Sequence, residues 1–240
     1  MPGIRDREVV MPAKIESIQV GRSRFFEAAS DSVKPWTSAI VKTAVTGPVL
    51  VSENGLDGDQ QSDLVHHGGA DKAVLAYAIS HYAFWHTRYP EHRFVAGGFG
   101  ENLTISGFDE TTCCIGDVWQ VGGCLMEISQ PRQPCWKLSR RWSIPKLAQE
   151  VQDERRTGWY LRVVQPGSVQ AGDEVVLVER RHPKFTIDHG LGVMYANPRV
   201  KEDDLELAHL PELSTSWKTN LHSRAAQHEH AQDQPRLLGN

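Results

Sequence analysis

Few of the features that mark a common class of protein occur in this chain of 240 residues. It contains no run of 18 apolar residues, so the sequence predicts no membrane-spanning helix. Its N-terminus lacks a basic segment followed by an apolar core, so no secretory signal peptide is expected. The formal net charge is −4, which argues against the strong positive field that attracts nucleic-acid polymers or anionic membranes. We therefore expect a cytoplasmic protein that binds neither a nucleic-acid polymer nor a membrane.

Cysteine is scarce, with four residues at positions Cys113, Cys114, Cys124 and Cys135. They form no C-x-x-C pair, and none lies at zinc-finger spacing from a pair of histidines, so the common structural zinc sites are excluded. In a reducing cytoplasm we expect all four to be free thiols.

Several catalytic and nucleotide-binding motifs are also missing. No G-x-G-x-x-G turn occurs within a strand–helix–strand pattern, which argues against a dinucleotide-binding fold. The chain contains no P-loop, no H-E-x-x-H and no Ser-His-Asp order, so these motifs predict no nucleotidase, zinc peptidase or serine hydrolase.

The chain does contain a series of short strand-like runs separated by turns. Gly122 and Gly123 separate two of them, and a Gly-Gly pair tolerates the positive φ angles of a tight hairpin turn. The other runs are rich in β-branched residues or alternate apolar with polar residues, as strands do. Short strands at this spacing favour a mainly β fold and a β-barrel over an α/β sheet. The predicted strands cover residues 14–20, 37–45, 49–51, 103–105, 116–121, 124–129, 160–164 and 174–179.

Helical periodicity is confined to a few segments. Apolar residues recur every three or four positions between Asp71 and Tyr89, which predicts a helix with Asp71 as its N-cap. A second helix is expected over residues 143–155, capped by Ser143. Three more short helices are predicted near the C-terminus, over residues 186–195, 203–209 and 214–224.

These patterns divide the chain into four parts. Residues 1–13 are predicted to form a flexible leader, and residues 14–181 a β-barrel domain with a few peripheral helices. Residues 182–224 are predicted to form a small three-helix C-terminal appendage. The polar residues 225–240 contain few apolar side chains, so we expect them to be disordered.

The segment over residues 129–138 carries the strongest candidate for chemistry. It places Cys135 beside two prolines and beside the cations Arg132 and Lys137. A thiolate is the nucleophile and the soft-metal ligand, and nearby cations lower the pKa of a cysteine. The prolines restrict φ, so the loop should be stiff, and Arg132 can bind phosphate in a bidentate fork. The residues alone leave a second interpretation open, in which Cys135 is a buried small hydrophobe and the cations are solvated surface charges.

Other positions carry groups that suit an anionic or heterocyclic ligand. The neighbours of Lys42 favour an exposed strand lysine over a phosphate ligand. His67, Gly68 and Gly69 form either a loop whose backbone N–H groups cradle an anion or an ordinary polar loop before a helix. Asn102 offers donors and an acceptor to a heterocycle, or it is a turn residue ahead of a strand.

Five motifs, in order, resemble those of MOSC-domain proteins of the YiiM type. They are GLDGDQQSD, HHGGADKAV, GGFGENLT, IGDVWQVGG and ISQPRQPCWKL. Their order and separations fit across about residues 37–180. The segment LSTSWKTNLHSR is similar to the three-helix C-terminal extension of the same proteins. The resemblance therefore covers most of the chain.

The resemblance implies a fold and an activity. It implies a MOSC-type β-barrel that binds the molybdenum cofactor, a pterin dithiolene with a phosphate. It maps the cysteine that coordinates molybdenum in the reductase members onto Cys135, which would be both the metal ligand and the catalytic residue. The cofactor-binding groups would be Lys42, His67, Gly68, Gly69, Asn102, Arg132 and Lys137.

The implied reaction is the reduction of N-hydroxylated bases, such as 6-N-hydroxylaminopurine, to the amines, which detoxifies base analogues. The chain has no flavin, haem or iron–sulfur motif, so the implied electron donor is a separate reductase. A different class of function stays open: a module that carries or stores the cofactor, or carries sulfur, without turnover. The sequence does not identify the physiological substrate, the electron donor, the form of the pterin or the oligomeric state.

Overall fold

A computed structural model describes residues 12–27, 34–61, 68–227, 236, 237 and 239. The predicted flexible leader, apart from residues 12 and 13, lies outside these ranges, as does most of the predicted disordered tail. No helix within the described ranges is long and apolar enough to span a membrane.

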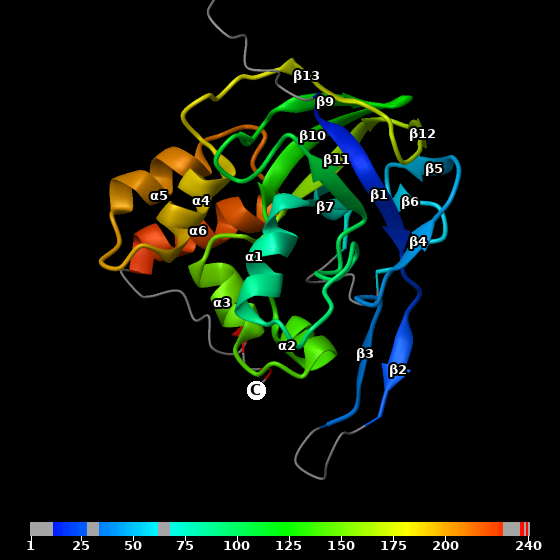
Figure 1. Cartoon of the computed structure of the whole chain (residues 1–240). Helices are drawn as coiled ribbons and strands as arrows, with labels where there is room; N and C mark the ends of the chain where they lie inside the picture. Colours follow the sequence, from blue (N-terminus) through cyan, green and yellow to red (C-terminus); the bar gives the residue numbers. More distant parts are fainter. Residues whose placement is uncertain (1–11, 28–33, 62–67, 228–235, 238, 240) are drawn as a thin grey trace, which may run out of the picture.

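An eight-stranded sheet forms the centre of the molecule (Figure 1). Neighbouring strands are antiparallel, except for the parallel pair β7 and β8. From edge to edge the order is β13 (Val175–Glu179), β9 (Val118–Val121), β10 (Cys124–Pro131), β11 (Trp159–Gln165), β7 (Val74–Ala78), β8 (Leu103–Ser106), β1 (Lys14–Val20) and β4 (Thr43–Val45). The mainly β architecture with several helices agrees with the sequence prediction.

Two smaller sheets accompany the large one. β12 (Gly167–Val169), β5 (Val49–Ser52) and β6 (Gly55–Leu56) form a three-stranded sheet, and β2 (Arg24–Phe26) pairs with β3 (Trp36–Ser38). The β2–β3 pair extends away from the rest of the molecule in Figure 1. The predicted continuous strand over residues 37–45 is therefore wrong, because residues 39–42 form an irregular segment between β3 and β4.

The edge strand β13 approaches the start of β1, near the opposite edge of the large sheet, without forming a ladder. The N–H of Val175 donates to the carbonyl of Ala13 at 2.8 Å, and the N–H of Ile15 donates to that of Asp173 at 2.9 Å. Lys14 and Glu174 form one isolated antiparallel bridge. The described strands thus form no continuously paired closed barrel, and the barrel stays a prediction.

The predicted helix over residues 71–89 is wrong in its first half. The segment contains a 3-10 turn, η1 (Ala70–Lys72), then strand β7, and only then a helix, α1 (Ser80–Arg88). All five residues of β7 are buried, and both faces are covered: Val74, Ala76 and Ala78 belong to the main hydrophobic cluster, and Tyr77 belongs to a second one. A strand buried on both faces is continuously apolar, so its sequence matches helical spacing as well. Asp71 begins no helix in its own segment. Its carboxylate pairs with Arg162 at 2.7 Å and accepts from the N–H of Thr215, the first residue of helix α6 (Thr215–Gln227), at 3.2 Å.

The predicted helix over residues 143–155 is shorter and starts later than expected. The structure has α2 (Trp136–Trp142) and α3 (Leu147–Asp153). Ser143 adopts a left-handed conformation with φ 56° and ends α2 rather than beginning a helix. Pro145 then lies in the turn between the helices, where its missing N–H costs no helical hydrogen bond.

The three predicted C-terminal helices are present as α4 (Ile187–Tyr195), α5 (Lys201–Ala208) and α6 (Thr215–Gln227). The hydroxyl of Thr186 caps α4 by accepting from the N–H of His189 at 3.0 Å. Leu207, Trp217 and Leu221 belong to the same buried cluster as the sheet residues Trp119 and Trp159. The three helices therefore complete the main hydrophobic core.

A second hydrophobic cluster lies where α1, α2 and α3 meet (Figure 1). It is largely aromatic, and Tyr77 from β7 stacks on Phe99 with the ring centroids 4.7 Å apart. Leu138 of α2 and Leu147 of α3 are fully buried in it. This cluster anchors α2, and with it the loop that carries Cys135.

The expected disorder from residue 225 is wrong for the described part of that segment. Residues 225–227 form the last turn of α6. Arg236 forms hydrogen bonds with Pro134 and Gln152, and Leu237 is buried.

If the C-terminal helices complete the core, replacing Trp217 should destabilise the whole molecule. We expect Trp217→Ala to lower the free energy of unfolding by about 3–5 kcal/mol, because it leaves a large cavity in a shared core. Urea denaturation followed by circular dichroism measures this. The exposed Phe25 is the control, and Phe25→Ala should change stability by less than about 0.5 kcal/mol. A loss below about 1 kcal/mol for Trp217→Ala would show that the helices contribute little to the main core.

Candidate functional site

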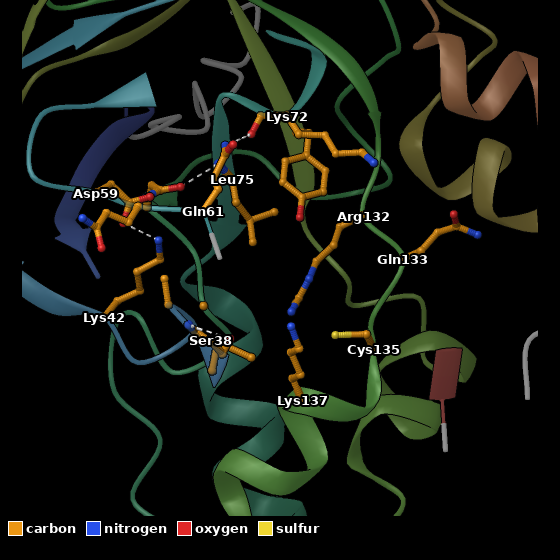
Figure 2. Close-up of a pocket in the computed structure, with 16 residues that line it drawn as sticks. Ser38, Lys42, Asp59, Gln61, Lys72, Leu75, Arg132, Gln133, Cys135 and Lys137 are labelled. Carbon is orange, nitrogen blue, oxygen red and sulfur yellow. Dashed lines mark hydrogen bonds and ion pairs between the residues drawn. The ribbon is translucent and has the colours of Figure 1, made fainter. Parts of the chain in front are cut away.

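One pocket collects residues from segments far apart in the sequence (Figure 2). It encloses about 680 Å³ of empty space, part of which is open solvent. Four of its residues are cationic and one is a carboxylate. The lining comprises Ser38, Ala39, Ile40, Lys42, Asp59, Gln60, Gln61, Lys72, Leu75, Gly100, Asn102, Arg132, Gln133, Cys135, Lys137 and Tyr160.

The thiol of Cys135 enters the pocket from the junction of β10 and α2. Cys135 is extended (φ −126°) and directly precedes α2, and the residue is 9% exposed. Its carbonyl accepts from the N–H of Leu138 at 3.0 Å, so the buried Leu138 holds the start of the helix. On the same helix, Arg141 donates to the carbonyls of Ile40 and Gly97, both at 2.6 Å. These bonds connect the helix after Cys135 to the Ser38–Ile40 side of the lining.

The other three cysteines are unsuited to ionise. Burial raises the pKa of the Cys113 thiol well above its usual value, and Asp117 adds to this shift. Burial and Asp117 also raise the pKa of Cys114. Burial raises the pKa of Cys124 to about 11, with a contribution from Asp173. None of the three lines the pocket, and all are fully buried.

Arg132 is a buried cation without a described acidic partner. It is 5% exposed, its backbone N–H donates to the carbonyl of Gly158 at 3.0 Å, and its guanidinium donates to the carbonyl of Thr157 at 3.4 Å. No carboxylate of the described residues forms an ion pair with it. Figure 2 shows the Arg132 guanidinium and the Lys137 ammonium pointing toward each other, with the sulfur of Cys135 beside them. Two converging cations favour an anionic ligand between them.

Lys42 and Asp59 form a buried ion pair elsewhere in the lining. Nζ of Lys42 lies 2.5 Å from Oδ1 of Asp59, and their side chains are 7% and 9% exposed. Burial lowers the pKa of Lys42, while Asp59 acts in the opposite direction. The Asp59 carboxylate also accepts from the N–H of Gly21 at 2.6 Å. The interpretation of Lys42 as an exposed strand lysine is therefore wrong.

Asn102 lines the pocket with its amide already engaged. Its Nδ2 donates to Asp59 at 2.8 Å and to the carbonyl of Gln19 at 3.3 Å. Its Oδ1 accepts from the N–H of Leu75 at 3.1 Å. In this structure Asn102 positions Asp59. Both N–H groups of its amide are engaged, so without a rearrangement only the second lone pair of Oδ1 is left for a heterocycle.

The described residues of the loop at positions 67–69 do not line the pocket, although the family resemblance implied that they bind the cofactor. His67 lies outside the described residues. Gly68 and Gly69 are described but do not line the pocket. The carbonyl of Gly69 accepts from the N–H of Lys72 at 2.9 Å, and Lys72 itself lines the pocket.

Sequence reasoning missed seven polar residues of the lining, which are Ser38, Asp59, Gln60, Gln61, Lys72, Gln133 and Tyr160. Asp59 and Gln61 lie within the motif GLDGDQQSD, which supports the family resemblance but supplied no candidate site residue. Tyr160 sits on β11, where period-two alternation gives its side chain an orientation different from its buried neighbours Trp159 and Leu161. Gln133 directly follows the candidate Arg132, and Lys72 lies three residues after the candidate Gly69, so only the tertiary structure shows that they line the pocket.

The pocket thus offers one thiol, several cations and few carboxylates. Such a set fits a ligand that combines an anionic group with a metal centre that prefers sulfur. The same cavity therefore contains cations for the anionic group of such a ligand and a thiol for its metal centre.

Comparisons with known proteins agree with the motifs. A model of the MOSC domain matches residues 63–176. Protein YiiM of Escherichia coli K12 is 35% identical over 189 residues, which cover 78% of this chain and 84% of that protein. The crystal structure of YiiM from Geobacillus stearothermophilus matches with a TM-score of 0.76 and 34% identity, over 89% of this chain and all of that one. A Gibberella moniliformis protein named "Reductase" is 36% identical over 154 residues, 63% of this chain and 27% of that protein.

The burial pattern predicts which thiol reacts in the folded protein. Iodoacetamide at neutral pH should label Cys135 and leave Cys113, Cys114 and Cys124 unmodified, because those three are buried and have raised pKa values. Peptide mass spectrometry identifies the labelled residue. Cys135→Ser should abolish native labelling, and the control Cys124→Ala should not. Labelling of another cysteine before Cys135 would contradict the assignment of the pocket thiol.

The Lys42–Asp59 pair predicts a second measurable effect. Asp59→Asn should lower the free energy of unfolding by about 3 kcal/mol, because it leaves the buried Lys42 charge unpaired. Added pyrophosphate should raise the melting temperature of this variant more than that of the wild type, since the pocket gains net positive charge.

The exposed Asp57 provides the matched control, because its side chain forms no described ion pair. Asp57→Asn should leave both the stability and the response to pyrophosphate unchanged. If Asp59→Asn and the wild type had equal free energies of unfolding, the Lys42–Asp59 ion pair would contribute nothing to stability.

Proposed function

Because the chain belongs to the MOSC-domain family, we propose that it is an oxidoreductase that binds the molybdenum cofactor and reduces N-hydroxylated bases. One observation carries the proposal: the Cys135 thiol shares a pocket with the buried cation Arg132, which forms no ion pair with a carboxylate of the described residues. In this proposal Cys135 is the protein's ligand to the metal.

The residues of the pocket fit the chemistry of that cofactor. A thiolate is a soft ligand and suits a metal that dithiolene sulfurs already hold. The phosphate of the pterin requires cations, which Arg132, Lys137 and Lys72 supply. When bound, the cofactor supplies two-electron redox chemistry. The protein's own residues bind and orient it and limit the access of water.

An N-hydroxylated base, such as 6-N-hydroxylaminopurine, is the proposed substrate. Its reduction to the amine takes up two electrons and two protons, breaks the N–O bond and releases water. Gln61 places an amide group in the lining: its Nε2 donates to the carbonyl of Lys72 at 3.0 Å, and its Oε1 can accept a hydrogen bond from a heterocycle. The relative named as a reductase supports redox chemistry, and a separate reductase would provide the electrons.

Metal analysis and a viologen assay together test the proposal. Protein made in a host that synthesises the cofactor should contain molybdenum and should reduce 6-N-hydroxylaminopurine with dithionite-reduced viologen. We expect Cys135→Ser to lower the rate by about 100-fold or more, because a metal ligand is lost. Arg132→Met should lower the molybdenum content, because the anionic group of the cofactor loses its buried cation.

Cys124→Ala is the control for the first variant, and Arg93→Ala, at an exposed arginine, for the second. Both should retain the metal and the activity. A wild type without molybdenum would refute the cofactor proposal. Molybdenum without turnover would leave only the alternative, a module that carries or stores the cofactor.

A further inference from the structure

The C-terminal residues Arg236, Leu237 and Gly239 return to the loop that carries Cys135. Their contacts involve Pro134 and Trp136, the two residues that flank Cys135 in the sequence. None of these contacts belongs to the pocket itself, because the C-terminal residues are absent from its lining. They approach the loop from outside the pocket.

Arg236 connects the loop to two helices. Its Nη1 donates to the carbonyl of Pro134, and its Nη2 donates to Oε1 of Gln152 on α3 at 2.5 Å. The same Nη2 lies 3.4 Å from the hydroxyl of Tyr195 at the end of α4. The planar guanidinium is suited to this arrangement, because its donors point in fixed directions toward several acceptors.

Tyr195 extends this connection into the pocket lining. Its hydroxyl also accepts from Nε2 of Gln133 at 3.3 Å, and Gln133 lines the pocket. The Arg236 guanidinium lies 5.8 Å from the centre of the Tyr195 ring. Arg236 and Gln133 therefore both donate to the hydroxyl of Tyr195.

Gly239 packs tightly on the residue after Cys135. A Cβ atom added to Gly239 would lie 2.8 Å from Cγ of the Trp136 indole, and Gly239 has φ +75°. A larger residue would both strain this backbone and collide with the ring. Leu237, between the two contacts, is only 6% exposed. Burial of an apolar side chain adds to the polar contacts in holding the segment down.

We propose that Arg236, Leu237 and Gly239 form a clamp that holds the Cys135 loop in position, with Arg236 as its positioning residue. The clamp acts through the Pro134 carbonyl and the Trp136 ring, so it fixes the backbone on both sides of the thiol. Its value for metal binding rests on the proposed function. Its effect on the position of the thiol does not, because the contacts are made by the protein alone.

Hydrogen–deuterium exchange of the protein without cofactor tests the clamp directly. Arg236→Ala should raise the exchange rate of the amides of Gln133 and of residues 135–138 about tenfold, because a charge-assisted hydrogen bond to the loop is lost. Iodoacetamide labelling of Cys135 should accelerate to a similar extent. Peptides from α6 and from the strands of the large sheet should exchange as in the wild type, which a general loss of stability would not allow.

Graded variants separate positioning from folding. Arg236→Lys should restore part of the protection, since an ammonium can reach one carbonyl but cannot bond in a fork. Gly239→Ala should loosen the loop through Trp136 while leaving Arg236 in place. Arg93→Ala, an exposed arginine distant from these contacts in sequence, is the control and should change neither rate.

The exchange and labelling experiments test the clamp without any molybdenum bound to the protein. Unchanged exchange over residues 133–138 and unchanged labelling of Cys135 in Arg236→Ala would overturn the clamp. Faster exchange throughout the molecule would also overturn it, because Arg236 would then serve overall stability. A protein that showed the local effect but bound no molybdenum would support the clamp and refute the proposed function.

Discussion

The antiparallel pairing of β10 with β11 is the constraint on which the pocket depends. β10 lies between β9 and β11, and its last pair joins Pro131 to Trp159. One residue further, the N–H of Arg132 donates to the carbonyl of Gly158. The register of the two strands therefore fixes the position of the Arg132 backbone. Cys135 follows three residues later. A one-residue slip of this pair would turn every side chain of the strand to the opposite face.

The cost of burying Arg132 explains the character of the pocket. A buried cation is tolerated only with hydrogen bonds or opposite charge nearby. Arg132 has hydrogen bonds to backbone carbonyls, while the one described carboxylate of the lining, Asp59, pairs with Lys42. The excess positive charge is thus concentrated near Cys135. A ligand with an anionic group would supply the missing charge, which connects local electrostatics to the proposed cofactor.

Packing behind the pocket holds its parts in place. The aromatic cluster of α1, α2 and α3 anchors the helix that follows Cys135, and Arg141 of α2 ties it to the Ile40 segment. The helices α4, α5 and α6 close the main core, and Tyr195 at the end of α4 reaches Gln133 in the lining. Residues separated by more than 100 positions in the chain therefore support a single loop. This arrangement suits a site that must present one sulfur atom in a defined place.

The sequence by itself determined most of the short strands, the Gly122–Gly123 hairpin and the three C-terminal helices. These follow from local rules: side-chain periodicity, turn glycines and capping residues act over a few positions. It could not distinguish β7 from a helix, since a strand covered on both faces has no alternating pattern. Only the tertiary structure decided that Lys42 is paired with Asp59, that the Asn102 amide is already bonded, and that Arg236 reaches Pro134. Each of these contacts joins residues distant in the chain, and no local pattern encodes which distant partner a polar group will meet.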